Sequence, residues 1–242
     1  MRIKTTLFLF LCIVKLSAQK STVDSLHHKR FNYKPLIFST VLIGYGLASL
    51  NSSFLISVNR SIQESFDTTK STHADDITML LPTLSVYGLN MVGIKGQNDF
   101  KNRTLIIGTA SVLVLSTVFA TKSITQRERP NATSNDSFPS GHTAVAFMGA
   151  EFMYQEYKHI SPWYGVIGYG IAATTGYLRM YNNKHWFSDV VAGAGFGILS
   201  TKLAYLMYPY LQKKLFKSNT STSFVTPFYN GEHMGISLIK SF

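Results

Sequence analysis

Residues 139–147 read PSGHTAVAF, a serine-glycine pair and a histidine directly ahead of an apolar run. The pattern predicts a loop that ends at the N-terminus of a helix, where Ser140 and Gly141 present free backbone N–H groups. These groups and the helix dipole favour a bound anion, and Gly141 lets that anion approach the backbone closely. His142 can then donate a proton to a leaving oxygen. A plain turn and helix cap, with His142 at the surface, is the alternative interpretation.

A basic segment lies upstream, where residues 122–130 read KSITQRERP directly after an apolar run. Lysine and arginine in such a place commonly compensate the helix dipole or mark a membrane boundary. The alternative is a phosphate clamp, because a guanidinium binds two phosphate oxygens at once and an ammonium adds a point charge. Lys122 and Arg129 are the candidate residues of that clamp.

A third polar segment lies downstream, where residues 178–189 read LRMYNNKHWFSD. His185 and Asp189 are four residues apart, so they share a face if this stretch opens a helix. A carboxylate that accepts a hydrogen bond from one ring nitrogen fixes the tautomer and leaves the other nitrogen as a nucleophile. A surface pair at a helix start is the alternative. Arg179 adds a further cation.

Long uncharged stretches between the polar segments predict an all-α fold. They are residues 35–59, 77–94, 104–121, 160–178 and 190–201, and a weaker run covers 143–157. Because a membrane span needs about 20 mostly apolar residues, we expect a helical bundle of about six apolar helices embedded in a membrane. A compact helical protein with apolar core helices is the alternative. In an alternating helical topology, the three polar segments meet at one end of the bundle and form one pocket.

The composition supports a membrane location and an anionic ligand. Of the 242 residues, 45% are hydrophobic and only 14% are charged, below the quarter or so that is usual in soluble domains. The net charge of +11 suits an anionic partner, but the basic residues are scattered singly, which argues against nucleic acid. One cysteine, Cys12, excludes a disulfide framework. Glycines 193, 195 and 197 lie inside an apolar run and indicate close helix packing, not a nucleotide loop.

The three segments together resemble the signature of the type-2 phosphatidic acid phosphatase and vanadium haloperoxidase superfamily, which reads K-x6-R-P, P-S-G-H and S-R-x5-H-x3-D. The first two motifs are complete, and the third has Leu178 where the family has serine. The resemblance covers residues 122–189 by motif. The chain also looks like bacterial members that carry a leader peptide and a short polar tail.

The resemblance implies a role for each matching residue. His185 would attack phosphorus and form a phosphohistidine, Asp189 would orient and stabilise His185, and His142 would protonate the leaving group and then activate water. The phosphoryl oxygens would be held by Lys122, Arg129, Ser140, Gly141 and Arg179. No metal or other cofactor is implied. Glu128 and Asp136 are expected on the solvated surface.

We therefore expect a phosphatase that acts on phosphomonoesters or diphosphates, with a phosphorylated lipid or prenyl diphosphate as substrate; phosphatidate and lipid A phosphate belong to this class. The alternatives are a vanadium-dependent haloperoxidase in which His185 ligates vanadate, a soluble exported non-specific acid phosphatase, and a non-enzymatic membrane scaffold. The oligomeric state is left open.

The ends of the chain predict an exported protein. Residues 1–19 have a basic start, a short apolar run and small residues near a plausible cleavage point, as in a signal peptide or an N-terminal anchor. We assign residues 20–212 to the helical phosphatase domain and 213–242 to a C-terminal tail, in which 223–227 and 235–239 are candidate strands. The expected location is the bacterial cell envelope: either the inner membrane with the site facing the periplasm, or the periplasm itself.

Two sequence signals conflict on the membrane topology. The positive-inside tendency places the basic segments 27–34, 95–103 and 213–217 in the cytoplasm, whereas a cleaved leader would leave 27–34 outside. Three solutions stay open. The leader is retained as a span, one apolar run does not cross, or the protein is peripheral.

Overall fold

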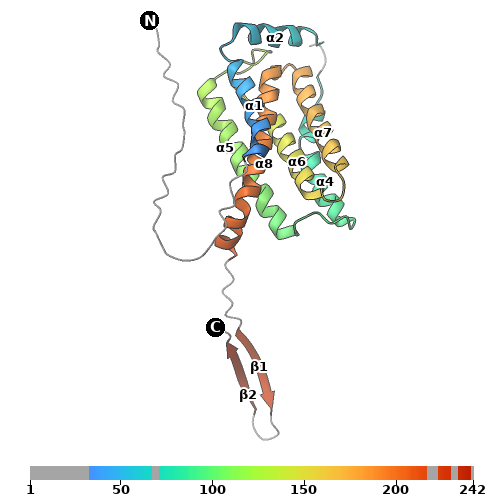
Figure 1. Ribbon diagram of the computed structural model, residues 1–242, viewed down its shortest axis with the longest axis vertical. Helices are drawn as coiled ribbons and strands as arrows, with labels where there is room; N and C mark the ends of the chain where they lie inside the picture. The colour runs from blue at the N-terminus through green and yellow to red at the C-terminus, as the bar shows by residue number, and fades with distance from the viewer. Residues whose placement is uncertain (1–32, 67–70, 217–222, 230–233, 241–242) are drawn as a thin grey trace. The chain divides into compact units, whose positions relative to one another are not determined.

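A computed structural model describes residues 33–66, 71–216, 223–229 and 234–240 of the chain. The predicted leader at 1–19 lies outside these residues. The described part contains eight helices (Figure 1), which are α1 (Lys34–Ala48), α2 (Ser53–Glu64), α3 (Ala74–Thr78), α4 (Leu81–Met91), α5 (Phe100–Thr125), α6 (Gly141–Tyr157), α7 (Trp163–Tyr181) and α8 (Phe187–Leu215).

The helical prediction is confirmed for this bundle, but the expected number of about six helices is wrong because two apolar stretches break. The first stretch, 35–59, bends by 93° between α1 and α2. Ser52 caps α2 there, since its hydroxyl accepts the Leu55 N–H at 3.4 Å. The second stretch, 77–94, begins at the end of α3 and is interrupted before α4 starts at Leu81. Pro82 lies in the first turn of α4, the one part of a helix that needs no N–H from proline.

The C-terminal tail contains a two-stranded antiparallel hairpin of β1 (Ser223–Tyr229) and β2 (Met234–Lys240). Its register pairs Ser223 with Lys240. The candidate strands at 223–227 and 235–239 are therefore confirmed, and each is slightly longer than expected.

Two of the described helices, α5 and α8, are long and apolar enough to cross a membrane. They have 26 and 29 residues, which gives lengths of about 39 and 44 Å against a hydrocarbon core of about 30 Å. The bent pair α1–α2 makes a third candidate if it counts as one span. On α5, apolar side chains such as Val112 and Ile124 are 68% and 82% exposed, which is the surface that a lipid environment accommodates.

Helix α6 packs against α4, α5, α7 and α8, so it forms the middle of the bundle (Figure 1). Its contact with α8 is close because α8 has glycines there, as the sequence indicated. A Cβ on Gly193 would lie 2.5 Å from the Ser140 carbonyl oxygen, and one on Gly197 would lie 2.7 Å from the Met148 nitrogen. The Ser140 N–H also donates to the Asp189 carbonyl at 3.0 Å. The first turns of α6 and α8 are therefore fixed side by side.

A buried ionic network explains why α6 carries an acidic residue inside an apolar run. Glu151 is 1% exposed and accepts hydrogen bonds from Lys202 of α8 at 2.9 Å and from Gln155 at 2.6 Å. The Tyr169 hydroxyl of α7 donates to the same carboxylate. A buried carboxylate needs such partners, so Glu151 links three helices of the bundle.

Candidate active site

The three sequence motifs meet in one cavity of about 330 Å³. The end of α5, the loop that follows it, the start of α6, the end of α7 and the loop before α8 all contribute. The candidate residues that line it are Lys122, Arg129, Gly141, His142, Arg179 and His185. The other two candidates, Ser140 and Asp189, are fully buried next to it. The structure therefore brings all eight candidate residues together.

The His185 ring is hydrogen-bonded to the backbone through its Nδ1. Its Nδ1 lies 2.7 Å from the Ser137 carbonyl oxygen, an acceptor, so Nδ1 carries the proton and Nε2 has a free lone pair. Asp189 stands further away, with its Oδ2 at 3.8 Å from Nδ1. This differs from the direct hydrogen bond that the four-residue spacing predicts. The reason is that α8 begins at Phe187, so His185 precedes the helix and does not share a helical face with Asp189.

The protonation state of His185 suits a nucleophile. The side chain is almost completely buried, and this burial lowers the pKa of His185 to about 4, although Asp189 opposes the effect. The positive charges of Arg179 and Lys122 lower that pKa further. The imidazole is therefore neutral near pH 7.

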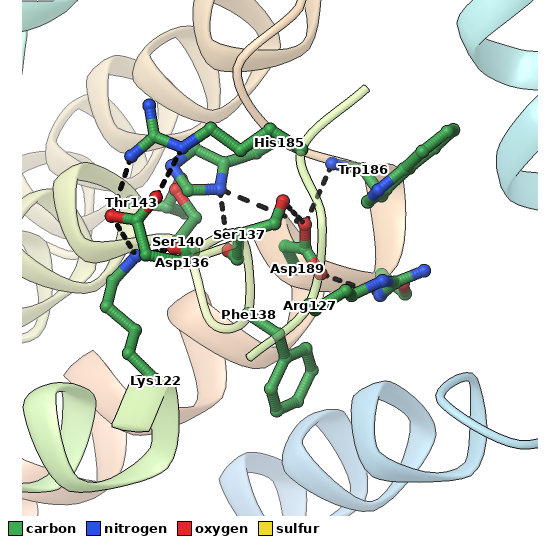
Figure 2. A network of polar contacts seen from close by, with 12 residues as sticks. Lys122, Arg127, Asp136, Ser137, Phe138, Ser140, Thr143, His185, Trp186 and Asp189 are labelled. Atoms are coloured by element: carbon green, nitrogen blue, oxygen red, sulfur yellow. Dashed lines mark hydrogen bonds and ion pairs between the residues drawn. The ribbon is translucent and has the colours of Figure 1, made fainter. Parts of the chain in front are cut away.

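Asp189 is the centre of a hydrogen-bond network behind His185 (Figure 2). Its Oδ2 accepts from the Ser137 hydroxyl at 2.5 Å and from the Trp186 N–H at 2.9 Å, and its Oδ1 accepts from Arg127 at 2.7 Å. Sequence reasoning missed Arg127 and Ser137. Arg127 lies within the first motif, so its charge was a signal, whereas nothing in the pattern singled out Ser137. The network joins the loop before α6 to the loop that carries His185.

The two cations of the first motif are already paired with a carboxylate. Arg129 donates from Nε and Nη2 to the two oxygens of Asp136 at 2.8 and 2.9 Å, and the Lys122 Nζ lies 3.5 Å from Asp136 Oδ2. Lys122 also donates to the Asp136 backbone carbonyl, and Figure 2 shows Lys122 reaching toward this residue. The expectation of a solvated Asp136 holds only in part: the side chain is 45% exposed, but it is paired with both cations. The loop after α5 folds back and places its carboxylate in the cavity.

The charge of Asp136 is stabilised in this position. Partial burial raises the pKa of Asp136, but hydrogen bonds from Ser134 and Arg129 and the charge of Lys122 outweigh it and hold the pKa well below its ordinary value. The group is thus an anion with two oxygens bound to a guanidinium, the arrangement that a phosphate would adopt there.

Arg179 combines a bound and a free edge. Its Nη1 donates to Asp75, a buried residue of α3 that also accepts from Asn182 at 3.0 Å. The Arg179 Nε is buried and has no hydrogen-bond partner among the residues that the structure describes. A buried donor of this kind is costly unless an acceptor reaches it, and a phosphoryl oxygen in the cavity is such an acceptor.

His142 contacts α3, the short helix that also carries Asp75. Its Nε2 lies 2.8 Å from Asp76 Oδ1. Burial and then the charge of Arg179 lower the pKa of His142, and the hydrogen bond to Asp76 opposes this effect. Sequence reasoning did not single out Asp75 or Asp76, because they lie in a polar connector far from any motif.

Asp75, Asp76 and His142 also form a group whose ligand atoms lie within 4.8 Å of one another, close enough to hold a metal ion. The sequence offered no such cluster, since its members are distant along the chain. The Arg179 guanidinium already provides Asp75 with a positive charge, so within the described residues this carboxylate is neutralised without a metal.

Comparisons with known proteins agree with these motifs. Residues 103–213 match the model of the PAP2 superfamily. The lipid A 1-phosphatase of Porphyromonas gingivalis is 38% identical over 135 residues, which cover 55% of this chain and 30% of that protein. The matched region is thus less than a third of the relative's length.

One solved structure shows the same fold. The transmembrane PAP2 type phosphatidylglycerolphosphate phosphatase from Bacillus subtilis has a TM-score of 0.51 and 21% identity, and the alignment covers 74% of this chain and 98% of that one. Aquifex aeolicus LpxE aligns with a TM-score of 0.47 and 21% identity over 62% of this chain and 94% of that one. Through residues 103–213, which contain all three motifs, this chain belongs to the PAP2 superfamily.

Proposed function

We propose that this chain is a lipid phosphatase that hydrolyses a phosphomonoester or diphosphate through a covalent phosphohistidine at His185. One observation carries the proposal. A buried, neutral imidazole, with Nδ1 bound to the Ser137 carbonyl, lines the same cavity as Lys122, Arg129 and Arg179. A free imidazole nitrogen next to three cations is the arrangement that phosphoryl transfer to histidine requires.

The reaction has two displacement steps. In the first, His185 Nε2 attacks phosphorus, the bond to the leaving oxygen breaks, and His142 gives that oxygen a proton. In the second, His142 takes a proton from water, the water oxygen attacks phosphorus, and the bond to His185 breaks to release inorganic phosphate. Asp189 stabilises the positive charge that His185 carries while it is phosphorylated.

Charge on the equatorial phosphoryl oxygens is neutralised by fixed donors. Lys122, Arg129 and the free Nε of Arg179 supply the cations, and the Gly141 N–H at the start of α6 adds the helix dipole. Ser140 acts on the loop, since its hydroxyl is bound to Thr143 at 2.8 Å. These groups, all from the chain itself, account for both steps.

The apolar wall of the cavity favours a lipid substrate. Met79, Val114, Leu115, Val118, Phe119 and Val145 line the cavity together with the phosphate-binding groups. Four of these belong to α5, a candidate membrane span. A phosphate attached to an apolar chain therefore matches both halves of the cavity. The names of two similar proteins, a lipid A 1-phosphatase and a phosphatidylglycerolphosphate phosphatase, support a phosphorylated lipid as the substrate class. Phosphatidate and prenyl diphosphates belong to this class by their chemistry.

The charges at the other end of the spans support a site on the periplasmic side of the inner membrane. Lys101 near the start of α5 lies over the ring of Phe216, directly after α8, so these two helix ends are neighbours. Lys213 and Lys214 lie there too. By the positive-inside tendency this end faces the cytoplasm. Lys213→Cys, in a Cys12→Ser background, should resist a membrane-impermeant maleimide in intact cells. Labelling at this position would show the opposite orientation.

The test of the function is phosphate release by the full chain from a panel of phosphatidate, phosphatidylglycerophosphate, undecaprenyl diphosphate and lipid A, with a soluble phosphomonoester for comparison. We expect release from at least one lipid, loss of that release in His185→Ala, and no change in His159→Ala, which removes an exposed histidine. Vanadate should inhibit because its trigonal-bipyramidal form mimics the transition state. Halide oxidation with added vanadate and no phosphate release would instead identify a haloperoxidase.

A further inference from the structure

Helix α3 brings a carboxylate to the proposed proton donor. Asp76 Oδ1 lies 2.8 Å from His142 Nε2, and the same carboxylate is 3.6 Å from His73 Nδ1. The His142 ring makes no other hydrogen bond within the described part of the chain, so its Nδ1 has no partner there. The pair therefore has one ring nitrogen on a carboxylate and the other available to a substrate, as in other carboxylate-imidazole pairs of enzymes.

The bond to Asp76 selects the useful forms of the ring. In the neutral ring the proton sits on Nε2, where Asp76 accepts it, and Nδ1 has a lone pair that can take a proton from water. In the charged ring Nδ1 also carries a proton, which it can give to a leaving oxygen. One orientation thus serves both steps of the reaction.

Other charges near His142 act in opposite directions. The residues that share its cavities are the acids Asp75 and Asp136, the cations Arg179, Arg129, Lys122 and Lys184, and the histidines His73 and His185. Arg179 disfavours a charged His142, whereas Asp75 and Asp76 favour it, and Asp76 does so most because it is hydrogen-bonded. Asp75 is already paired with Arg179, so Asp76 is the acid that most favours a proton on His142, against the opposing effects of burial and Arg179.

We propose that Asp76 is a positioning residue of the reaction: it fixes the His142 ring through Nε2 and leaves Nδ1 free to carry the proton for the leaving oxygen. The inference rests on the phosphatase function proposed above. It assigns a role to a residue outside the three motifs, and it predicts that the role matters in proportion to how much the leaving group needs a proton.

The experiment compares two substrates in Asp76→Asn and in the parent chain. A short-chain phosphatidate has an alkoxide leaving group that needs a proton, whereas p-nitrophenyl phosphate has one that leaves without it. A general acid contributes about 10²–10⁴-fold, so we expect kcat/KM for phosphatidate at pH 7 to fall about tenfold or more, with less than a twofold change for p-nitrophenyl phosphate. The alkaline limb of the phosphatidate profile should move to lower pH, and Asp76→Glu should restore part of the rate. Glu64→Gln, which removes an exposed carboxylate, is the matched control.

A second measurement does not depend on activity. NMR of the labelled histidines in detergent, with His142 assigned by His142→Gln, follows the protonation of this ring directly. Asp76→Asn should lower the pKa of His142. An unchanged titration would overturn the proposal, as would an equal loss on both substrates. If the parent chain released no phosphate from any substrate, the proposed function would fail, and the NMR titration would still decide whether Asp76 controls His142.

Discussion

Replacement of Asp136 by asparagine should make the site bind phosphate more tightly. The carboxylate holds Arg129 through two hydrogen bonds of 2.8 and 2.9 Å and lies 3.5 Å from the Lys122 ammonium. A substrate phosphate must displace it to reach both cations. The Asp136 side chain is 45% exposed, so each pair is worth only about 0.5–1 kcal/mol after solvent screening. Two pairs give about 1–2 kcal/mol, which corresponds to about 5- to 30-fold in affinity.

The assay is steady-state hydrolysis with inorganic phosphate as a competitive inhibitor. In Asp136→Asn, KM for a lipid phosphate and Ki for phosphate should both fall by this factor. Glu128→Gln is the control, because Glu128 is exposed on the same loop and its side chain has no contact with either cation among the described residues. A higher KM in Asp136→Asn would refute the reasoning, since it would mean that the carboxylate orders Lys122 and Arg129 for the substrate instead of competing with it.

Three further predictions concern His185, Asp189 and the helix contact. Because burial depresses the pKa of His185 to about 4, the acid limb of kcat/KM should lie near pH 4, and a limb near 6.5 would show that the ring is solvated. The unfolded chain binds a proton at His185 at higher pH than the folded chain does. The contribution of neutral His185 to the unfolding free energy is therefore fully present above pH 6.5 and falls by about 3 kcal/mol as the pH drops to 4. Thermal unfolding should show a smaller loss over this range in His185→Gln. Arg127→Gln breaks a buried ion pair with Asp189 and should cost about 3–5 kcal/mol in unfolding free energy, whereas Arg60→Gln at an exposed position should cost little; equal effects would contradict the network. Gly197→Ala places a methyl group 2.7 Å from the Met148 nitrogen and against the Ala144 carbonyl, so it should sharply reduce folded protein, and a normal melting temperature would exclude the close contact.

The parts of the site that sequence reasoning recovered are those with local patterns. Fixed spacings such as that from His185 to Asp189 identify motif residues, and an alternating helical topology is enough to bring Lys122, His142 and Arg179 to one end of the bundle. The hairpin strands were recoverable for the same reason, because each is a short apolar run between polar residues.

The parts that it missed depend on tertiary contacts that have no pattern. The Ser137 group that binds His185 is a backbone carbonyl, which every residue has. Asp75 and Asp76 reach the site because the short helix α3, which precedes the apolar run of α4, packs against α7 and α6. Asp136 looked isolated because the folding-back of its loop is not visible in the order of residues.

The close contact between α6 and α8 has a practical consequence for redesign. Since Gly193 lies against the Ser140 carbonyl, the first turns of α6 and α8, next to His142 and His185, are held by backbone against backbone and not by long side chains that a neighbour could shift. The apolar wall, by contrast, consists of replaceable side chains on α5, such as Leu115 and Phe119. Libraries confined to that wall can search for new acyl-chain preferences while the reacting groups keep their spacing.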